Sequence, residues 1–481
     1  MSDLENLPYY KIKTLLANKK ISCLEIVRYF ISKAKKDQYN AFRIVTEKQA
    51  LSYASICQER VDQGKMKGLE CLPIAVKDNF CTQGISTTAC SKILENFIPP
   101  YESTVTQKIF NDGSVMIGKT NMDEFAIGSL SMNSAYGHVI NPYKKHNSSK
   151  NLVAGGSSGG SAVAVAARMC VAALGTDTGG SIRLPASFTG TIGMKPTYGR
   201  CSRYGIISFA SSFDQAGVFT NNVIDNAMIM KSICGFDYKD STSEKIDNSN
   251  FMSGIGKSIK GMKIGIPKEY MLGNVSESIN ERITYTASML RNAGAEIVEI
   301  SLPHTANALP VYYTITSAEA SSNLSRYDGV RYGNRVEKTG DSFSDMVKKT
   351  RYKYLGEEVQ KRIITGTYVL SSNNYQDYYV KAQKIRRMIY EEFKQAFQKV
   401  KILITPTSKS TAFPIDIAED CREVYNNDIF TVPSSLAGIP AMSFPIGHDI
   451  DGLPVGIQLL SNHFEESEIY KIARILEINK N

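Results

Sequence analysis

Residues 173–187 read ALGTDTGGSIRLPAS, an apolar run that enters a glycine-rich bend with a serine at its end. A second bend of this kind, AGGSSGGSAVAVA, occupies residues 154–166 and opens into a run of alanine and valine. A serine in a glycine-rich bend is a candidate nucleophile. No histidine lies beside either bend, so the two stretches raise the question of which side chain takes the proton.

Lys77 is the candidate base, because it ends the apolar run LPIAV at residues 72–76. A lysine at the end of a buried strand is costly to keep charged, and desolvation lowers its pKa. The neutral amine that results can accept a proton from a serine. The local sequence leaves open the alternative of a lysine whose amine reaches solvent or pairs with Asp78.

The two bends have features that favour catalysis over a plain turn. Residues 178–180 precede Ser181, and glycines in such a turn let backbone amides converge on one point as an oxyanion hole. The bend around Ser157 opens into residues 161–174, which are predicted to form a buried helix whose positive dipole end faces the same pocket. Each stretch alone is also compatible with a tight turn or an anion-binding nest.

Two familiar patterns in the chain are discounted. Residues 113–120, GSVMIGKT, match a phosphate-binding loop, but the interior SVMI is apolar and predicts a strand rather than an exposed loop. Residues 155–159, GGSSG, match the nucleophile elbow of hydrolases, which needs a buried strand just before it. The preceding residues, KKHNSSKN, are polar and cannot form that strand.

Composition limits the class of protein. The chain has 481 residues, a net charge of +9, five dispersed histidines and nine cysteines without a Cys-x-x-Cys pair, so we expect a reducing compartment and no metal site. The N-terminus lacks an apolar targeting segment, and the longest apolar run, inside residues 162–174, is shorter than the roughly 20 residues that span a membrane. We expect a cytoplasmic enzyme, with an organelle matrix as the alternative. The scattered basic residues indicate a solvated surface or a surface that docks RNA or an RNA-bound partner.

Helical and strand-like segments alternate along the chain. This alternation predicts an α/β fold whose sheet is covered by helices on both faces. The predicted segments are a helical N-terminal part at about 1–65, strands within 70–80 and 262–267, and helix-to-strand units at 104–120, 281–303 and 391–407. A final helix is predicted to bury Ile469, Ile472, Ala473 and Leu476.

The pair of motifs GGSSGGS at 155–161 and ALGTDTGGSIRLPAS at 173–187 resembles the amidase signature family, and the resemblance covers nearly the whole chain. It implies an open mixed β-sheet in a single domain over residues 1–481, and a Ser–Ser–Lys triad. In that triad Ser181 would be the nucleophile, Ser157 would relay its proton from a cis peptide bond after Gly156, and Lys77 would be the final base. The amides of Thr178, Gly179 and Gly180 would hold the oxyanion.

Further stretches, among them GKTNMDEFAIGS at 118–129 and DIFTVPSSLAGIPAMSFP at 428–445, resemble the A subunits of glutamyl-tRNA(Gln)/aspartyl-tRNA(Asn) amidotransferases. That resemblance implies a glutaminase that sends ammonia to a B subunit, in a heterotrimer with B and C subunits. There a tRNA-bound glutamate, activated by ATP, becomes the amide. ATP and magnesium would belong to the partner, and no cofactor is expected in this chain. Whether the tRNA accepts glutamine, asparagine or both stays open.

Glutamine is a zwitterion, so its carboxylate needs a guanidinium and its ammonium needs a carboxylate. By resemblance, Arg362 and Asp428 would fill these roles, and Tyr313 would add a contact, with the adjacent Tyr312 as the alternative. The segment 141–156 is longer and more polar than the family's usual run, which predicts a surface loop. The alternatives are a stand-alone amidase of the same fold acting on small amides and a catalytically silent scaffold.

Overall fold

An eleven-stranded mixed β-sheet runs through the computed structural model, which describes residues 4–246, 249–271, 275–419 and 427–480. The strands lie side by side in the order β1-β3-β2-β4-β6-β5-β10-β11-β9-β7-β8. Their bounds are β1 Phe42–Val45, β2 Pro73–Lys77, β3 Val115–Thr120, β4 Ala172–Asp177, β5 Ile192–Lys195, β6 Gln215–Thr220, β7 Lys263–Pro267, β8 Glu296–Ile300, β9 Ile402–Pro406, β10 Ala441–His448 and β11 Pro454–Ser461.

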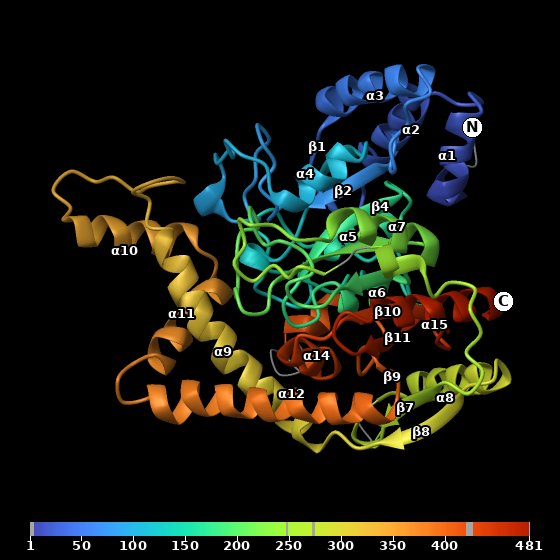
Figure 1. The fold of residues 1–481 in the computed structure, drawn as a ribbon. Helices are drawn as coiled ribbons and strands as arrows, with labels where there is room; N and C mark the ends of the chain where they lie inside the picture. The colour runs from blue at the N-terminus through green and yellow to red at the C-terminus, as the bar shows by residue number, and fades with distance from the viewer. Residues whose placement is uncertain (1–3, 247–248, 272–274, 420–426, 481) are drawn as a thin grey trace.

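Helices cover both faces of this sheet, and others extend from one side of it (Figure 1). The helices are α1 Tyr9–Ala17, α2 Cys23–Ala34, α3 Glu47–Asp62, α4 Thr104–Asn111, α5 Gly159–Ala166, α6 Arg183–Thr189, α7 Val223–Ile233, α8 Glu277–Asn292, α9 Ala308–Asn323, α10 Phe343–Tyr354, α11 Glu357–Val369, α12 Lys381–Lys399, α14 Val432–Ala437 and α15 Glu466–Asn479. The predicted α/β class, an open mixed sheet with helices on both faces, is confirmed.

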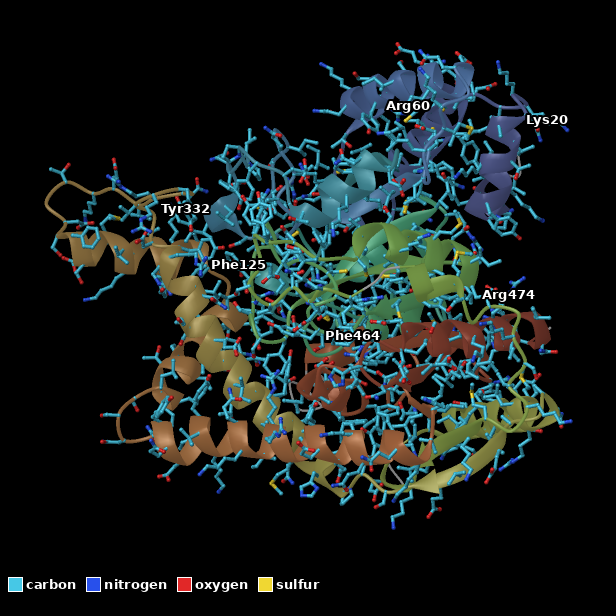
Figure 2. The ribbon with its side chains drawn as sticks, viewed as in Figure 1. Lys20, Arg60, Phe125, Tyr332, Phe464 and Arg474 are labelled. Carbon is cyan, nitrogen blue, oxygen red and sulfur yellow. The ribbon has the colours of Figure 1, made fainter. Side chains whose placement is uncertain are left out.

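The alternation of side chains along β2 shows how the two faces are filled. Ile74 and Val76 pack in a core formed with α4, α7, α8 and α15, whereas Ala75 packs in the opposite core with α2, α3 and α5. Side chains fill the space between the sheet and both layers (Figure 2). Because side chains alternate with period two, Lys77 lies on the same face as Ala75 and therefore on the face of α5. The helix that follows the first serine bend thus shares a face with the candidate base.

Helices α9, α11, α12 and α14 form a third core that borders the sheet. Figure 1 shows α11 crossing beside α9 and leading outward to α10, away from the sheet. None of the helices in the described parts of the chain is long and apolar enough to cross a bilayer.

Most of the predicted segments are confirmed. The units at 104–120, 281–303 and 391–407 form α4 and β3, α8 and β8, and α12 and β9. The segments 70–80 and 262–267 contain β2 and β7, and the apolar stripe of α15 is buried. The stretch GSVMIGKT ends in β3, with Lys119 buried and bonded to the Phe80 carbonyl and the Thr82 hydroxyl, so it is no phosphate-binding loop.

Two segment predictions are wrong. The N-terminal part is not wholly helical, because β1 lies within it and pairs antiparallel with β3. The predicted helix 161–174 ends at Ala166, where Arg168 adopts a left-handed conformation, and β4 begins at Ala172. A run of alanine and valine that is buried on every side fits a buried helix and a buried strand equally well. The single-domain assignment over 1–481 stays a prediction.

Candidate active site

Lys77 ends β2 fully buried, and its amine is surrounded by hydroxyl groups. Its Nζ lies 2.8 Å from Ser157 Oγ, 2.7 Å from Ser158 Oγ and 2.9 Å from Thr176 Oγ1. The two serines come from the bend that precedes α5, and Thr176 comes from the neighbouring strand β4. The structure therefore brings the predicted base and the predicted relay serine into direct contact.

Burial of Lys77 makes its neutral form accessible near pH 7. Burial lowers the pKa of Lys77 to about 7, although the carboxylates of Asp123 and Asp177 partly oppose this shift. Asp78, the alternative partner of Lys77, instead pairs with Arg43, whose Nε lies 2.7 Å from Asp78 Oδ2. A substantial fraction of Lys77 is thus an amine that can accept a proton.

The hydrogen bonds around Lys77 indicate where its lone pair points. The Ser158 hydroxyl donates its own proton to the Thr176 carbonyl at 3.0 Å, so it accepts from Lys77. Thr176 Oγ1 accepts from Asn79 Nδ2 at 3.0 Å as well as from Lys77. A neutral amine has two N–H groups and one lone pair, so donation to Ser158 and Thr176 directs the lone pair at Ser157. This arrangement favours transfer of the Ser157 proton to Lys77.

The two serine bends are joined through their backbones. The Gly156–Ser157 peptide bond is cis, as the resemblance implied. The Ser158 amide donates to the Ser181 carbonyl at 3.2 Å, and the Asp123 amide donates to the Ser157 carbonyl at 3.2 Å. Ser181 is 8% exposed and faces a small pocket. The bend that carries the candidate relay is therefore joined to the candidate nucleophile by a backbone hydrogen bond.

Asp177, the last residue of β4, fixes the turn that carries Ser181. Its carboxylate accepts from the amides of Gly180 and Ile182 at 2.9 and 3.1 Å, and from Arg183 Nη2 and Nε at 2.8 and 3.0 Å. Burial alone would raise the pKa of Asp177, but the attraction and hydrogen bonds of Arg183 outweigh it and hold that pKa below its usual value.

This geometry corrects one part of the predicted oxyanion hole. The Gly180 amide is directed at Asp177, so in this arrangement it orients the turn instead of facing a substrate oxygen. The amides of Thr178 and Gly179 stay predicted donors. Gly179 lines the same pocket as Ser181.

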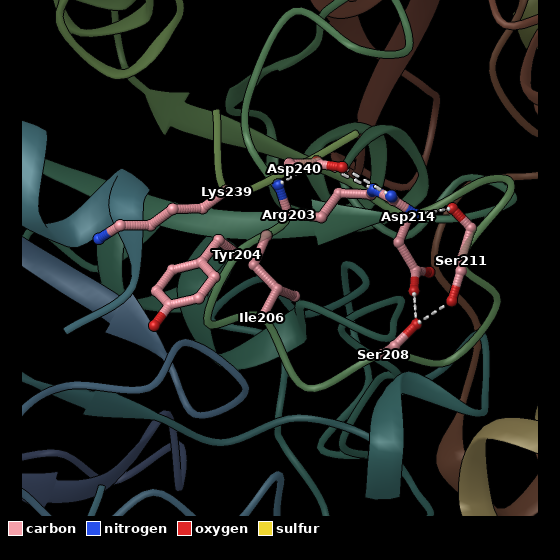
Figure 3. A pocket seen from close by; sticks show the side chains of 8 residues that line it. All are labelled: Arg203, Tyr204, Ile206, Ser208, Ser211, Asp214, Lys239 and Asp240. Atoms are coloured by element: carbon pink, nitrogen blue, oxygen red, sulfur yellow. Dashed lines mark hydrogen bonds and ion pairs between the residues drawn. The ribbon is translucent and has the colours of Figure 1, made fainter. Parts of the chain in front are cut away.

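Asp214 supports this turn from behind. The Thr178 hydroxyl donates to Asp214 Oδ1 at 2.7 Å, and the Ser208 hydroxyl donates to Asp214 Oδ2 at 2.8 Å. Burial raises the pKa of Asp214 to about 6. Asp214 also lines a second pocket of about 220 Å³, in which Arg203 is paired with Asp240 (Figure 3). The predicted catalytic and substrate-binding residues do not line that pocket, so we assign it no part in the site.

The pocket in front of Ser181 gathers the predicted substrate-binding residues. Tyr313 comes from α9, Arg362 from α11 and Asp428 from the short helix Asn427–Phe430. All three line the pocket with Ser181, and so does Tyr312, the alternative to Tyr313. Four segments that are far apart in the chain thus meet at one cavity.

The pocket has a positive wall and an acidic wall. The Arg362 guanidinium lies over the Tyr313 ring, 4.4 Å from its centroid, and its Nε is 3.0 Å from Glu358 Oε1. Asp428 Oδ2 accepts from the Ser129 hydroxyl at 2.5 Å and from the Tyr313 hydroxyl at 3.3 Å. Burial raises the pKa of Asp428 to about 7, against the effect of these two hydrogen bonds. The charges of these walls are complementary to a small ligand that carries a carboxylate and an ammonium group.

Sequence reasoning missed several residues of the site. Asp177 precedes the turn that carries Ser181, and Arg183 follows it. Two opposite charges on the two sides of a glycine turn are a signal for an ion pair that the sequence offers. Ser129 gave no such signal, because its partner Asp428 is 299 residues away in the chain. Within the described residues, no group of three or more histidine, cysteine or acidic side chains is placed to hold a metal ion.

Comparison with known proteins gives consistent results. The family model described as Amidase matches residues 25–470. The chain is 50% identical to the A subunit of the glutamyl-tRNA(Gln) amidotransferase of Rhizobium meliloti (strain 1021), and 49% identical to the corresponding protein of Sinorhizobium medicae (strain WSM419). Each alignment covers 99% of this chain and 98% of the relative.

Solved structures show the same similarity. The A subunit of the glutamyl-tRNA(Gln) amidotransferase of Thermotoga maritima is 36% identical, with a TM-score of 0.80 over 99% of this chain and 95% of that one. A peptide amidase from Stenotrophomonas maltophilia is 25% identical, with a TM-score of 0.83 over 98% and 96% of the two chains.

Removal of the Arg183 charge tests whether its buried ion pair with Asp177 stabilises the protein. We expect Arg183→Met to lower the free energy of unfolding by about 3–5 kcal/mol, because Asp177 would be left as a buried, unpaired carboxylate. Urea unfolding measures this loss. Arg387→Met, which breaks the exposed pair with Glu391, is the control and should cost less than about 1 kcal/mol. Equal losses in the two variants would contradict a structural role for the buried pair.

The pKa of Lys77 predicts a pH dependence of Ser181 reactivity. Because the base form increases as pH rises through about 7, phosphonylation of Ser181 by a fluorophosphonate, with loss of fluoride, should accelerate over this range and then level off. Lys77→Ala should slow labelling by roughly 100-fold or more. Mass spectrometry of the labelled serine follows the rate.

Lys195→Met is the matched control for the lysine variant. Lys195 is equally buried with a pKa of about 7, but its amine donates to the carbonyls of Pro196 and Ile439. In the folded fraction of this variant, the rate of Ser181 labelling should depend on pH as it does in the wild type. A flat profile in the wild type, or wild-type labelling in Lys77→Ala, would remove Lys77 from the role of base.

Proposed function

Because the chain belongs to the amidase family and matches the A subunits of glutamyl-tRNA(Gln) amidotransferases along its whole length, we propose that it is the glutaminase subunit of such an amidotransferase. In this function it hydrolyses glutamine and supplies ammonia to a partner subunit. The single observation that carries the proposal is the pocket of Ser181, which has Arg362 on one wall and Asp428 on another.

The proposed binding mode follows from the charges of free glutamine. Its α-carboxylate pairs with Arg362, whose guanidinium is held by Glu358 and the Tyr313 ring. Its α-ammonium pairs with Asp428, which gives up its proton on binding because a cation beside a carboxylate lowers the pKa. The carboxamide then extends toward Ser181. An amide without these two charges leaves Arg362 and Asp428 without a partner from the substrate, which disfavours a stand-alone amidase of simple amides.

The proposed reaction moves one proton through the triad. Neutral Lys77 takes the proton of Ser157 while Ser157 takes that of Ser181, and Ser181 Oγ bonds to the carboxamide carbon. The amides of Thr178 and Gly179 stabilise the oxyanion. The proton returns to the nitrogen as the C–N bond breaks, so ammonia leaves and a γ-glutamyl ester remains on Ser181. Water, activated by the same base, hydrolyses the ester to glutamate and restores the hydroxyl.

The other parts of the reaction are assigned to partners. We propose a heterotrimer with B and C subunits, in which the partner uses ATP and magnesium to activate glutamate on tRNA(Gln), and aspartate on tRNA(Asn) as a further substrate. The ammonia released at Ser181 forms the new amide. The net charge of +9 suits a chain that assembles near RNA, and the cytoplasm or an organelle matrix suits this work.

Replacement of the nucleophile tests the division of labour. In a complex with the B and C subunits, ATP and Glu-tRNA(Gln), Ser181→Ala should lower glutamine-dependent amidation by at least roughly 1000-fold. Amidation supplied with ammonium chloride should stay within about twofold of the wild type, because free ammonia bypasses Ser181. Chromatography of the aminoacyl product measures both. Loss of both activities together would refute the proposal, and so would hydrolysis of simple amides that is indifferent to the partners.

Replacement of Arg362 tests the proposed substrate. We expect Arg362→Ala to raise the glutamine KM by roughly 100-fold while kcat changes little, since charged hydrogen bonds to the carboxylate are lost. Lys361→Ala is the matched control, because Lys361 lies on the same helix in an exposed pair with Glu357. An unchanged KM in Arg362→Ala would show that Arg362 does not bind the substrate. Steady-state ammonia release measures both variants.

A further inference from the structure

The N-terminus of α11 is attached to a buried carboxylate outside the predicted site. The backbone amide of Gly356, the residue before α11, donates to Glu124 Oε2 at 2.8 Å. The Ser91 hydroxyl donates to the other carboxylate oxygen, and Glu124 itself is 3% exposed. The fit at this junction is tight, because a side-chain carbon on Gly356 would collide with Glu124 Oε2.

Helix α11 carries Arg362, and it has a second attachment beyond that residue. Gly366 lies so close to the Ser317 carbonyl of α9 that a side chain there would collide with it. Arg362 lies between the Gly356 and Gly366 attachments, on a helix that leads away from the sheet (Figure 1). The position of its guanidinium relative to Ser181 therefore depends on both attachments.

Glu124 also belongs to the segment that supports the serine bend. The amide of the preceding residue, Asp123, donates to the Ser157 carbonyl at 3.2 Å. The Asp123 carboxylate accepts from the amides of Ser131 and Asn133, both at 2.9 Å. Two consecutive residues thus hold the relay serine on one side and the N-terminus of α11 on the other.

We propose that Glu124 is a positioning residue for glutamine binding: by holding the Gly356 amide, it fixes α11 so that Arg362 meets the glutamine carboxylate while the carboxamide lies at Ser181. The inference rests on the proposed function, since it takes the carboxylate of glutamine as the ligand of Arg362. Glu124 is not among the residues that line the pocket of Ser181, and its carboxylate is bonded to Ser91 and Gly356. Its removal should weaken glutamine binding and leave the chemistry at Ser181 largely intact.

The first experiment separates KM from kcat in the assembled complex with its partner subunits, ATP and Glu-tRNA(Gln). Glu124→Ala should raise the glutamine KM by roughly five- to tenfold with kcat within about twofold, because the acceptor for the Gly356 amide is lost. Glu124→Gln keeps a carbonyl oxygen for that amide and should restore KM to within about twofold of the wild type. A lower kcat with an unchanged KM in Glu124→Ala would overturn the proposal.

A proline at position 356 tests the same hydrogen bond from its other side. Gly356 has φ −68° and Leu355 lies at φ −97° and ψ 133°, values that a proline and its preceding residue adopt without strain. Proline has no N–H, so Gly356→Pro removes the donor. In the Glu124→Ala background, where no carboxylate meets the ring, Gly356→Pro should raise KM no further. A further tenfold rise in the double variant would show that Glu124 and the Gly356 amide act separately, against the proposal.

Two controls distinguish this inference from the proposed function. Glu357→Ala removes an exposed carboxylate at the same helix end and should leave KM unchanged. If Arg362→Ala raises KM and Glu124→Ala does not, the positioning role is wrong and the glutamine site stands. If Arg362→Ala leaves KM unchanged, the proposed glutamine site itself is wrong. An equal rise in KM in Glu357→Ala and Glu124→Ala would indicate a general disturbance of α11 and also overturn the proposal.

Discussion

The buried ion pair of Asp177 and Arg183 is the interaction on which the site depends. Beyond Asp177, the Arg183 guanidinium donates to the Thr431 carbonyl at 2.7 Å, and to Ser434 Oγ and Gln458 Oε1, both at 2.6 Å. These partners lie on or next to α14 and on β11, in the last part of the chain. Since its donors find acceptors on several elements, the cost of burying the charge is offset, and the turn that carries Ser181 is fixed to the segment that carries Asp428.

A second constraint is the exclusion of water around Lys77. Its pKa of about 7 results from burial, so the proton-accepting form exists only while the surrounding elements exclude water. The amine forms its hydrogen bonds with the hydroxyl groups of Ser157, Ser158 and Thr176. These groups carry no negative charge that would stabilise the protonated form of the lysine. The carboxylates that do act on it, such as Asp123, act at longer range and are occupied with backbone amides. The same burial therefore sets both the stability cost and the reactivity of this lysine.

The sequence predicts local features of the fold well and contacts between distant residues poorly. The helix-to-strand units around Gly113 and Gly294 were readable because a glycine turn separates a helical pattern from a short apolar run. The boundary between α5 and β4 was not readable, because a run buried on all sides has no periodicity that distinguishes helix from strand.

The same contrast applies to the candidate site. Lys77 stands out by its place after an apolar run, and the serine bends carry their own motif, so these residues and the pocket residues matched by resemblance could be named in advance. The direction of the Gly180 amide, the Ser129–Asp428 hydrogen bond and the support of α11 by Glu124 could not, because each depends on tertiary packing between separate segments.

The assembly of the pocket from Ser129, Ser181, Tyr313, Arg362 and Asp428 has a consequence for biosynthesis. A chain emerging from the ribosome contains the triad long before it contains Asp428 and the acceptors of Arg183 on α14 and β11. Those late elements also complete the centre of the sheet, since β10 and β11 lie between β5 and β9. For the proposed activity, a nascent or truncated chain has no glutamine site to fill, so ammonia release begins only when synthesis and folding of the whole chain are complete.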